Sequence, residues 1–458
     1  MSTIAAISTA PGIGGIGIVR MSGENTFNIL EKVFIPKLEE DISDIEGYRM
    51  KYGNIIDPKT NRIIDEVLVS YFKSPKSYTT EDMCEINSHG NFVISREILE
   101  ICLQNGAELA EPGEFTKRAF LNGRIDLSQA EATADIINSR TKIEAKAAIN
   151  QLEGFLSKQV KDIRQMLLNI LVEMEANIDY PEYDIEEVTE AKVKTELNLI
   201  KIKLNKLLQS FEDGKIIKEG IKLAIIGSPN VGKSSLLNAI LKEERAIVTD
   251  IAGTTRDSIE ETITIKGIPF KIVDTAGIRN ADNEVEKIGI EKAKKIAADS
   301  DVIVAMLDSS RNLNNEDKEI LAFIKDKKAI VALNKVDLEQ SAIRDNDAIK
   351  GKSKRVIEMS MTDNTGIDDL YEELVKMFNI NEINLDNENI VTNVRHKDLI
   401  EKAIKSIKDA EDTVNSQMPI DIIAINIKDA IENLSKITGE NVSEDIMKEI
   451  FSKFCLGK

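Results

Sequence analysis

The chain has 458 residues, 42% of them apolar, and a formal net charge of −19. This length predicts roughly three domains of about 150 residues each, which excludes a single-domain fold. The acidic balance excludes broad, sequence-independent nucleic-acid binding, because such binding depends on Lys and Arg side chains that neutralise phosphates. Any contact with RNA must therefore be local or shared with a partner.

The N-terminal residues show no basic region followed by an apolar core, and no segment approaches the roughly 18 consecutive apolar residues of a membrane span. Three cysteines, Cys84, Cys102 and Cys455, are too few and too scattered for a disulfide framework or a zinc site. We therefore expect a cytoplasmic protein without a membrane segment.

Residues 1–118 predict an α+β domain. Short apolar and β-branched runs separated by Gly, Pro and Asp predict strands, and one run with helical spacing ends near Gly106. The predicted strands are 3–8, 17–22, 48–55 and 64–72, and the predicted helix is 91–103.

Two local patterns in this region suggest sites that we do not expect. Gly12 to Gly17 matches the dinucleotide pattern G-x-G-x-x-G, but a β-branched run follows where that motif requires a helix. His89 lies near several carboxylates in the sequence, but the spacing fits no zinc motif. We interpret His89 as a structural histidine in a loop.

Two helical stretches, residues 119–215 and 380–458, flank the middle of the chain. The segment 126–180 is rich in helix formers and lacks Pro, which predicts long helices. Neither stretch makes a complete domain, so we expect one helical domain interrupted by an insertion, with two independent bundles as the alternative. Gly214 and Gly220 predict a hinge into the insertion. Apolar residues on one face of the preceding helix are Val193, Leu197, Ile200, Leu204, Leu207, Leu208 and Phe211.

The inserted region, residues 216–379, begins with a phosphate-binding loop. Residues Gly227 to Ser234 fit G-x-x-x-x-G-K-[ST] between an apolar strand at 223–226 and a helix. In this motif backbone N–H groups and the helix dipole favour phosphate, Lys233 reaches the outer phosphates and Ser234 can bind Mg²⁺. A chance glycine turn would not carry both flanks.

Two further segments suit a γ-phosphate. The polar loop 249–257 carries hydroxyls that can order around Mg²⁺ and the γ-phosphate. A predicted hairpin, with a turn at Lys266 and Gly267, leads into Asp274-Thr275-Ala276-Gly277. This D-x-x-G motif places a carboxylate in the Mg²⁺ shell and a glycine N–H near the γ-phosphate, a contact that hydrolysis removes.

Guanine selection is predicted by Asn334-Lys335-Val336-Asp337, which follows the apolar strand 329–333. The Asp337 carboxylate can accept two hydrogen bonds from the N1–H and the N2 amino group of guanine, which adenine does not offer. Four motifs in this order on alternating strands and helices predict a GTPase.

Ile278 stands where Ras-type enzymes use a glutamine to orient the attacking water. An apolar side chain cannot orient water, so another group must do so. The candidates are a monovalent cation near Asn230, a carboxylate within 283–287 and an arginine from a partner.

Three segments, Phe120 to Ala132, Thr249 to Asp257 and Phe454 to Lys458, together resemble the MnmE/TrmE family of tRNA-modifying GTPases. The resemblance implies a multidomain α/β and α+β fold. It comprises an N-terminal α+β domain that binds folate and forms a dimer, a discontinuous helical domain and an inserted Ras-like P-loop GTPase domain. The implied boundaries are 1–118, 119–215, 216–379 and 380–458.

The resemblance also implies an activity. The family acts as a homodimer with a flavin-dependent partner, MnmG, in a hetero-oligomer that adds a carboxymethylaminomethyl group to C5 of the wobble uridine of certain tRNAs. GTP hydrolysis would drive conformational change, and 5-formyl- or methylene-tetrahydrofolate would be the folate. The partner would supply much of the tRNA-binding charge. The alternative is an Era-like GTP-switched RNA-binding or ribosome-assembly factor, which should carry a compact basic block that this sequence lacks.

Ions and catalytic roles are implied by the same resemblance. K⁺ would lie where an arginine finger places its charge, which answers the question posed by Ile278, and Glu286 would help to position the water. The K⁺ ligands would be Asn230, Thr249, Ile251 and Thr254, and the Mg²⁺ ligands Ser234 and Thr255. The catalytic set is Asn230, Lys233, Asp274, Gly277 and Glu286. The GTP-binding set is Asn230, Val231, Gly232, Lys233, Ser234, Ser235, Thr249, Asp250, Ile251, Ala252, Gly253, Thr254, Thr255, Asp274, Thr275, Ala276, Gly277, Asn334, Lys335, Asp337, Ser360 and Met361.

Arg20, Glu85, Arg124 and Lys458 fall at the family's folate positions. A carboxylate suits the amino-pyrimidine edge of a pterin, and cations suit its glutamate tail.

Two departures and one cysteine qualify the resemblance. Arg124 stands where some members have Lys, which keeps the charge but changes the geometry. Ser360-Met361-Thr362 replaces the usual S-A-[KR] guanine loop, although the Met361 N–H could still contact the base. Cys455 has two interpretations, a direct chemical role or a small apolar residue near the folate.

Overall fold

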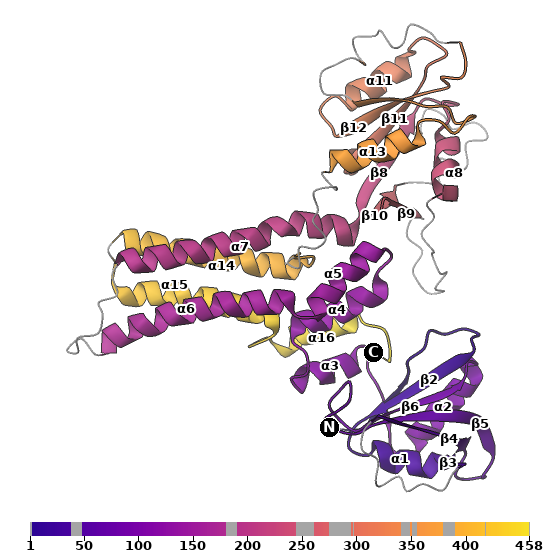
Figure 1. Cartoon of the computed structure of the whole chain (residues 1–458), viewed down its shortest axis with the longest axis vertical. Coiled ribbons are helices and arrows are strands. Elements are labelled where there is room, and N and C mark those ends of the chain that lie inside the picture. The colour runs from indigo at the N-terminus through magenta and orange to yellow at the C-terminus, as the bar shows by residue number, and fades with distance from the viewer. Residues whose placement is uncertain are drawn as a thin grey trace. The chain divides into compact units, whose positions relative to one another are not determined.

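The structure is a computed structural model that describes residues 2–37, 48–179, 190–243, 261–273, 295, 297–339, 349, 355–378, 390–416 and 418–457 (Figure 1). The chain divides into two compact units. The first consists of Met1–Ile137, Gln151–Ile200 and Lys402–Lys458, and the second of Asn138–Asn150 and Lys201–Glu401. Each unit contains a β-sheet and helices, so the predicted multidomain α/β and α+β fold is confirmed. Within the described ranges, every helix is too short or too polar to cross a membrane.

The first unit contains a seven-stranded sheet in the order β3-β4-β5-β6-β2-β1-β7. Its neighbouring strands are antiparallel, except that β7 runs parallel to β1. The strands are β1 (Ile4–Ile7), β2 (Ile16–Ser22), β3 (Phe34–Pro36), β4 (Arg49–Ile56), β5 (Ile63–Phe72), β6 (Met83–His89) and β7 (Glu108–Leu109).

Two helices, α1 (Thr26–Val33) and α2 (Phe92–Gln104), pack on one face of this sheet. Alternate residues of each strand point toward them, as the pleat requires, and Val19 and Met21 of β2 are fully buried there. Arg20, between these two residues, therefore points to the opposite face. We call this opposite face the uncovered face, because neither α1 nor α2 packs on it, although over β1 it is buried where Ile4 and Ala6 pack with Phe115. It carries the polar side chains from which a ligand site can be built.

The prediction that His89 lies in a loop is wrong, because Met83–His89 is strand β6, between β5 and β2. Its polar residues Glu85, Asn87 and His89 alternate with buried Cys84, Ile86 and Ser88 and lie on the uncovered face, which gives the segment the composition of a loop. His89 ends the strand. Its Nδ1 lies 2.7 Å from Asp65 Oδ1, and the hydrogen bond to Asp65 raises the pKa of His89 above its ordinary value.

The long helices predicted over 126–180 are interrupted. The segment forms α4 (Leu127–Asn138), α5 (Lys142–Leu152) and α6 (Phe155–Asp179). A break falls at Gly154, which has a φ of 86° that favours glycine.

The predicted helical stretch 380–458 contains three helices among its described residues. They are α14 (Val394–Asn415), α15 (Ile420–Thr438) and α16 (Glu444–Ser452). Helix α15, which follows the inserted region in the sequence, packs along α6, which precedes it. Lys428 Nζ lies 2.9 Å from Glu175 Oε1 (Figure 1). Helix α3 (Glu114–Leu121) contacts α16. Helices distant in the sequence thus pack together within one unit.

The prediction of a hinge between Gly214 and Gly220 is wrong for Gly214. Helix α7 (Glu190–Glu219) continues through this residue. A Cβ on Gly214 would lie 2.1 Å from the Val391 carbonyl oxygen. The glycine therefore allows close backbone approach rather than a bend. The predicted apolar face of α7 is confirmed, with Leu208 half-buried and the other six residues buried.

The second unit contains a six-stranded sheet in the order β13-β12-β11-β8-β10-β9. Its strands are parallel except for the β9-β10 hairpin, whose turn residues Lys266 and Gly267 have φ values of 49° and 88°. The strands are β8 (Ile221–Gly227), β9 (Glu261–Ile265), β10 (Ile268–Ile272), β11 (Val302–Asp308), β12 (Ala329–Asn334) and β13 (Arg355–Glu358).

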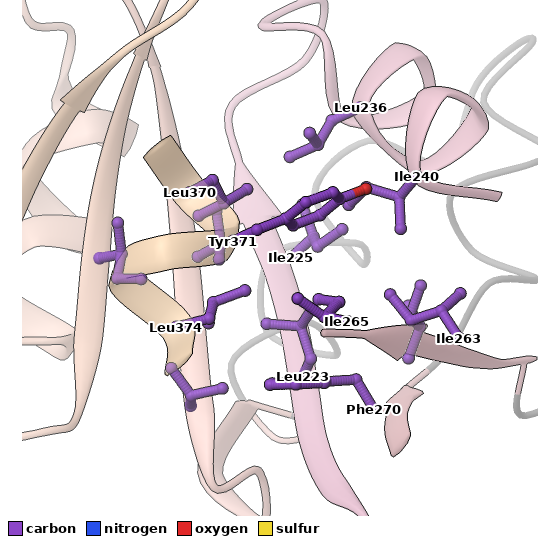
Figure 2. Packing of buried hydrophobic residues seen from close by; sticks show 14 of the residues in the cluster. Leu223, Ile225, Leu236, Ile240, Ile263, Ile265, Phe270, Leu370, Tyr371 and Leu374 are labelled. Carbon is purple, nitrogen blue, oxygen red and sulfur yellow. The ribbon is translucent and has the colours of Figure 1, made fainter. Parts of the chain in front are cut away.

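Both faces of this parallel sheet are covered, so β8 is an almost continuous apolar run. Leu223 and Ile225 point to α8 (Lys233–Glu243) and α13 (Ile367–Met377), a packing that Figure 2 shows around Tyr371. Ala224 and Ile226 point to α11 (Asn315–Phe323) on the opposite face. This burial fixes the strand and leaves its carboxyl end free to start a loop.

Candidate nucleotide site and ligand cavity

The phosphate-binding loop connects the end of β8 at Gly227 to the start of α8 at Lys233, as predicted. Gly232 has a φ of 104°, and a Cβ there would lie 2.2 Å from Asn334 Nδ2. A Cβ on Gly227 would lie 2.6 Å from the Met306 carbonyl oxygen. Both positions therefore require glycine, because a side chain would collide with the neighbouring strands β11 and β12.

Lys233 lies over this loop. Its Nζ donates hydrogen bonds to the carbonyl oxygens of Gly227, at 2.9 Å, and Ser228, at 2.8 Å. Burial lowers the pKa of the Lys233 ammonium below its ordinary value. A bound polyphosphate would favour the charged form, so the position fits an anion at the helix N-terminus.

Asn334 links three segments of the site. Its Nδ2 donates to the Val231 carbonyl oxygen of the phosphate loop at 2.7 Å, and its Oδ1 accepts from the Met361 N–H at 3.2 Å. The side chain is buried, with 2% of Asn334 exposed. The phosphate loop, the end of β12 and the Ser360-Met361 segment are thereby held together.

Lys335 and Asp337 follow directly. Lys335 has a φ of 65°, and its Nζ donates to Asp308 Oδ2 at 2.6 Å. Asp337 is exposed, so its carboxylate can meet a base. These residues lie beyond the carboxyl ends of parallel strands, the edge at which open α/β sheets bind ligands.

The structure thus brings together part of the predicted nucleotide site. The residues found at this edge are Asn230, Val231, Gly232, Lys233, Ser234, Ser235, Asn334, Lys335, Asp337, Ser360 and Met361. Those that lie outside the described residues are Thr249, Asp250, Ile251, Ala252, Gly253, Thr254, Thr255, Asp274, Thr275, Ala276, Gly277, Ile278, Glu286 and the predicted folate residue Lys458.

A separate cavity of about 630 Å³ lies in the first unit and brings Arg20, Glu85 and Arg124 together. Arg20 Nε and Nη2 donate to Glu85 Oε1 at 2.9 and 2.7 Å. These two residues are cross-strand partners in β2 and β6 on the uncovered face of the sheet. Three of the four predicted folate residues therefore line one cavity.

Tyr78 is a cavity residue that the sequence reasoning missed. The Arg124 guanidinium carbon lies 4.8 Å from the centroid of the Tyr78 ring, and Arg124 Nη1 donates to the Tyr78 carbonyl oxygen at 3.1 Å. Lys76 and Asn122 also line the cavity. No local pattern could have found Tyr78 and Lys76, because the folding of the 73–82 connection places them there, whereas Asn122 belongs to the Phe120 to Ala132 segment and donates to the Thr79 carbonyl oxygen at 2.7 Å.

The C-terminal segment approaches the same cavity. The Gly457 carbonyl oxygen accepts hydrogen bonds from Arg20 Nη1 at 3.2 Å and from Ser8 Oγ at 3.0 Å. Cys455, two residues earlier, is exposed. The described end of the chain therefore contributes to the position of Arg20.

Comparison with known proteins identifies the family. The family model for the MnmE helical domain matches residues 127–455, and the model for the GTP-binding protein TrmE N-terminus matches residues 3–124. The tRNA modification GTPase MnmE of Acetivibrio thermocellus is 50% identical over 100% of this chain and 99% of its own length. The chain belongs to the MnmE family. The MnmE of Clostridioides difficile is 49% identical over 100% of this chain and 99% of its own length.

Membership of the MnmE family confirms the resemblance stated from the sequence motifs and establishes the chain as a GTP hydrolase. A solved structure of Aquifex aeolicus Era bound to GDP·AlF4⁻ covers 41% of this chain and 66% of its own, with 27% identity and a TM-score of 0.28. The matches to MnmE relatives extend over the whole chain, which favours the MnmE assignment over the Era-like alternative.

Proposed function

We propose that the chain is a K⁺-activated GTPase that works in the cytoplasm as a homodimer with an MnmG-type flavoprotein. The complex installs a carboxymethylaminomethyl group on C5 of the wobble uridine of certain tRNAs. The observation that carries the nucleotide part is the junction at Asn334, which joins a phosphate cradle to a guanine-selecting loop. The names of the full-length relatives support tRNA as the substrate.

In the nucleotide site, Lys233 and the N–H groups of the phosphate loop would neutralise and orient the outer phosphates. Ser234 is exposed in the first turn of α8, where its hydroxyl can reach an Mg²⁺ ion shared with Thr255. Bound Mg²⁺ would spread the negative charge that develops on the phosphates. Asp274, Gly277 and Glu286 complete the proposal as Mg²⁺-shell, γ-phosphate and water-positioning residues. Loss of the γ-phosphate contact would then drive conformational change.

K⁺ activation is proposed through Asn230. This residue is exposed on the phosphate loop with a φ of 59°, so its carboxamide oxygen is free to face the phosphates rather than the core. Thr249, Ile251 and Thr254 would supply the remaining oxygen ligands. A cation there would provide the charge that Ile278 cannot provide.

K⁺ dependence is tested by measuring GTP turnover in KCl and in NaCl at equal ionic strength. We expect turnover in KCl to be faster by about tenfold or more, since one preorganised charge contributes this much to a phosphoryl-transfer barrier. Asn230→Gly, which keeps the left-handed backbone, should lose most of this difference. Equal rates of the unaltered chain in the two salts would contradict K⁺ activation.

The cavity in the first unit is proposed to bind 5-formyl- or methylene-tetrahydrofolate. Glu85, oriented by Arg20, would accept hydrogen bonds from the amino-pyrimidine edge of the pterin. Arg124, Lys76 and Lys458 would face the glutamate tail, and the Tyr78 ring offers an apolar wall. Among the described residues, the charged groups that line the cavity besides Glu85 and Arg20 are Lys76 and Arg124, both cations, which suits an anionic ligand.

Arg20→Ala should weaken the binding of 5-formyltetrahydrofolate about tenfold or more, because it removes a cation and the guanidinium that donates two hydrogen bonds to the Glu85 carboxylate. Titration calorimetry measures the affinity, and the melting temperature checks that the variant folds. Arg96→Ala is the matched control, because Arg96 pairs with Glu100 on the surface of α2. Undiminished affinity in Arg20→Ala would contradict the folate assignment.

The homodimer is proposed from the uncovered face of the first sheet. Several large apolar side chains there are exposed, among them Met50 (60%), Tyr52 (48%) and Leu68 (43%). Apolar residues grouped on one sheet face are typical of an interaction surface. With a net charge of −19, the chain also needs a partner to supply positive charge for tRNA.

A further inference from the structure

Three charged residues outside the predicted motifs connect the two loops of the nucleotide site. They are Asp308 at the end of β11, Arg311 in the following loop and Asp317 in the first turn of α11, and we call them the carboxylate bridge. All three belong to the second unit, as do both loops. The question is what this group does for nucleotide binding.

Asp317 holds the phosphate-binding loop through a buried hydrogen bond with Ser228. Its Oδ1 accepts a hydrogen bond from the Ser228 hydroxyl at 2.6 Å, and both residues are 1% exposed. Its Oδ2 accepts from the Asn314 N–H at 3.1 Å, in the capping box of α11. A buried carboxylate next to a loop that binds polyphosphate would repel the ligand unless its charge were balanced.

Asp308 holds the base-recognition loop in a similar way. Its Oδ2 accepts from Lys335 Nζ at 2.6 Å, and its Oδ1 accepts from the Ser310 N–H and hydroxyl at 3.0 and 2.6 Å. Burial acts to raise its pKa, but the hydrogen bonds from Lys335 and Ser310 hold the pKa of Asp308 below its ordinary value. Asp308 is therefore an anion that fixes Lys335.

Arg311 lies between the two carboxylates. Its Nη1 donates to Asp317 Oδ2 at 2.7 Å, its Nη2 donates to Asp317 Oδ1 at 3.4 Å, and its Nε lies 3.9 Å from Asp308 Oδ2. The planar guanidinium presents its N–H donors in a rigid fork that can pair with Asp317 through two hydrogen bonds while Nε faces Asp308, an orientation that the compact charge of an ammonium does not fix. The positive charge of Arg311 therefore faces both carboxylates, Asp317 next to the phosphate-binding loop and Asp308 next to Lys335.

We propose that Arg311 is a positioning residue that couples the phosphate-binding loop to the guanine-recognition loop. It balances the charge of Asp317 beneath Ser228 and steadies Asp308 against Lys335, so that both loops keep the geometry a guanine nucleotide requires. The proposal rests on guanine-nucleotide binding by these two loops, and it is independent of the K⁺ and folate assignments.

The test compares Arg311→Ala, Arg311→Lys and a control, Arg355→Ala, by the dissociation constants of GDP and GTP. Arg355 is a matched control because it is also half-exposed and pairs with a carboxylate, Glu373, at 2.6 Å in the same unit. We expect Arg311→Ala to weaken GDP about tenfold and GTP more, because the unbalanced Asp317 repels the higher charge more strongly. Arg311→Lys should resemble Arg311→Ala, and Arg355→Ala should resemble the unaltered chain.

Coupling is measured by combining Ser228→Ala with Lys335→Ala, one variant at each end of the bridge. If the two ends are coupled, the fold-loss of GDP affinity in the double variant is smaller than the two single fold-losses multiplied together, and we call this difference the shortfall. With Arg311 present, we expect a shortfall of about fivefold. When all variants also carry Arg311→Ala, the shortfall should become smaller, because only the hydrogen bonds of Asn334 then connect the two loops. An unchanged shortfall would overturn the proposal.

Two other outcomes would also overturn it. A lowered melting temperature with unchanged GDP and GTP affinities would make Arg311 a structural residue only, and full recovery by Arg311→Lys would reduce it to a simple ion pair. Failure of the underlying site is distinguishable, because Lys335→Ala alone would then bind GDP as tightly as the unaltered chain.

Discussion

Asp337→Asn should convert the chain from a guanine-selective to a xanthine-selective enzyme. The carboxylate of Asp337 accepts from both the N1–H and the amino group of guanine, whereas a carboxamide offers one acceptor and one donor and matches the 2-oxo group of xanthine. Because hydrogen bonds to a charged group contribute about 1.5–3 kcal/mol, the ratio of GDP to XDP affinity should change about hundredfold or more. Competition binding with the two diphosphates measures this ratio.

The position of Asp337 makes this a clean substitution. The side chain is exposed at the end of β12, and Asn334, which holds the loop to Val231, is left in place. Glu339→Gln offers a control, since it changes another exposed carboxylate in the same loop. If Asp337→Asn kept the original preference for GDP, the assignment of the base-binding loop would fail.

Gly232→Ala should strongly weaken nucleotide binding. The added Cβ would lie 2.2 Å from Asn334 Nδ2, so the carboxamide must move and give up its bond to the Val231 carbonyl oxygen. The phosphate loop and the guanine loop would then separate. We expect GDP affinity to fall about hundredfold or more and GTP turnover to fall with it.

The effect of the collision with Asn334 must be distinguished from backbone strain, because Gly232 has a φ of 104°, which an alanine adopts only with strain. Gly106→Ala is the matched control, since Gly106 has a φ of 114° and a Cβ there would meet nothing within 4 Å. Gly106→Ala should cost only backbone strain, about 1–2 kcal/mol of unfolding free energy, with GTP turnover retained. A Gly232→Ala variant with normal GDP affinity would contradict the described junction.

The parts of the fold that the sequence predicted correctly are those in which a short, local pattern of residues is sufficient to define the element. The phosphate loop was predictable because the apolar run at 223–226 and the helix after Lys233 define its flanks, and the apolar face of α7 was predictable from its period. Strand β6 was missed because α1 and α2 pack on only one of its faces, so Glu85, Asn87 and His89 on the other face are polar, and Ser88 is polar on the packed face as well. Gly214 was misread because its requirement comes from Val391, a contact that no local pattern records.

The candidate sites divide in the same way. Motif residues such as Lys233 and Asn334 were predictable because each belongs to a short pattern with a known chemistry. Tyr78, in the cavity, and Arg311, between two carboxylates, belong to no pattern. Their roles depend on which loops the strand order brings to one edge of a sheet, and that follows from the fold as a whole. The residues of the predicted site outside the described ranges, including Glu286, remain predictions.

The proposed role in tRNA modification is tested most directly by mass analysis of tRNA wobble nucleosides. Cells that lack the chain would be supplied with either the unaltered chain or Lys233→Ala, which removes the cation of the phosphate loop. We predict that 5-carboxymethylaminomethyl-modified uridine is absent without the chain, returns with the unaltered chain and does not return with Lys233→Ala. The account would be contradicted if the modified uridine persisted without the chain, or if Lys233→Ala restored it in full.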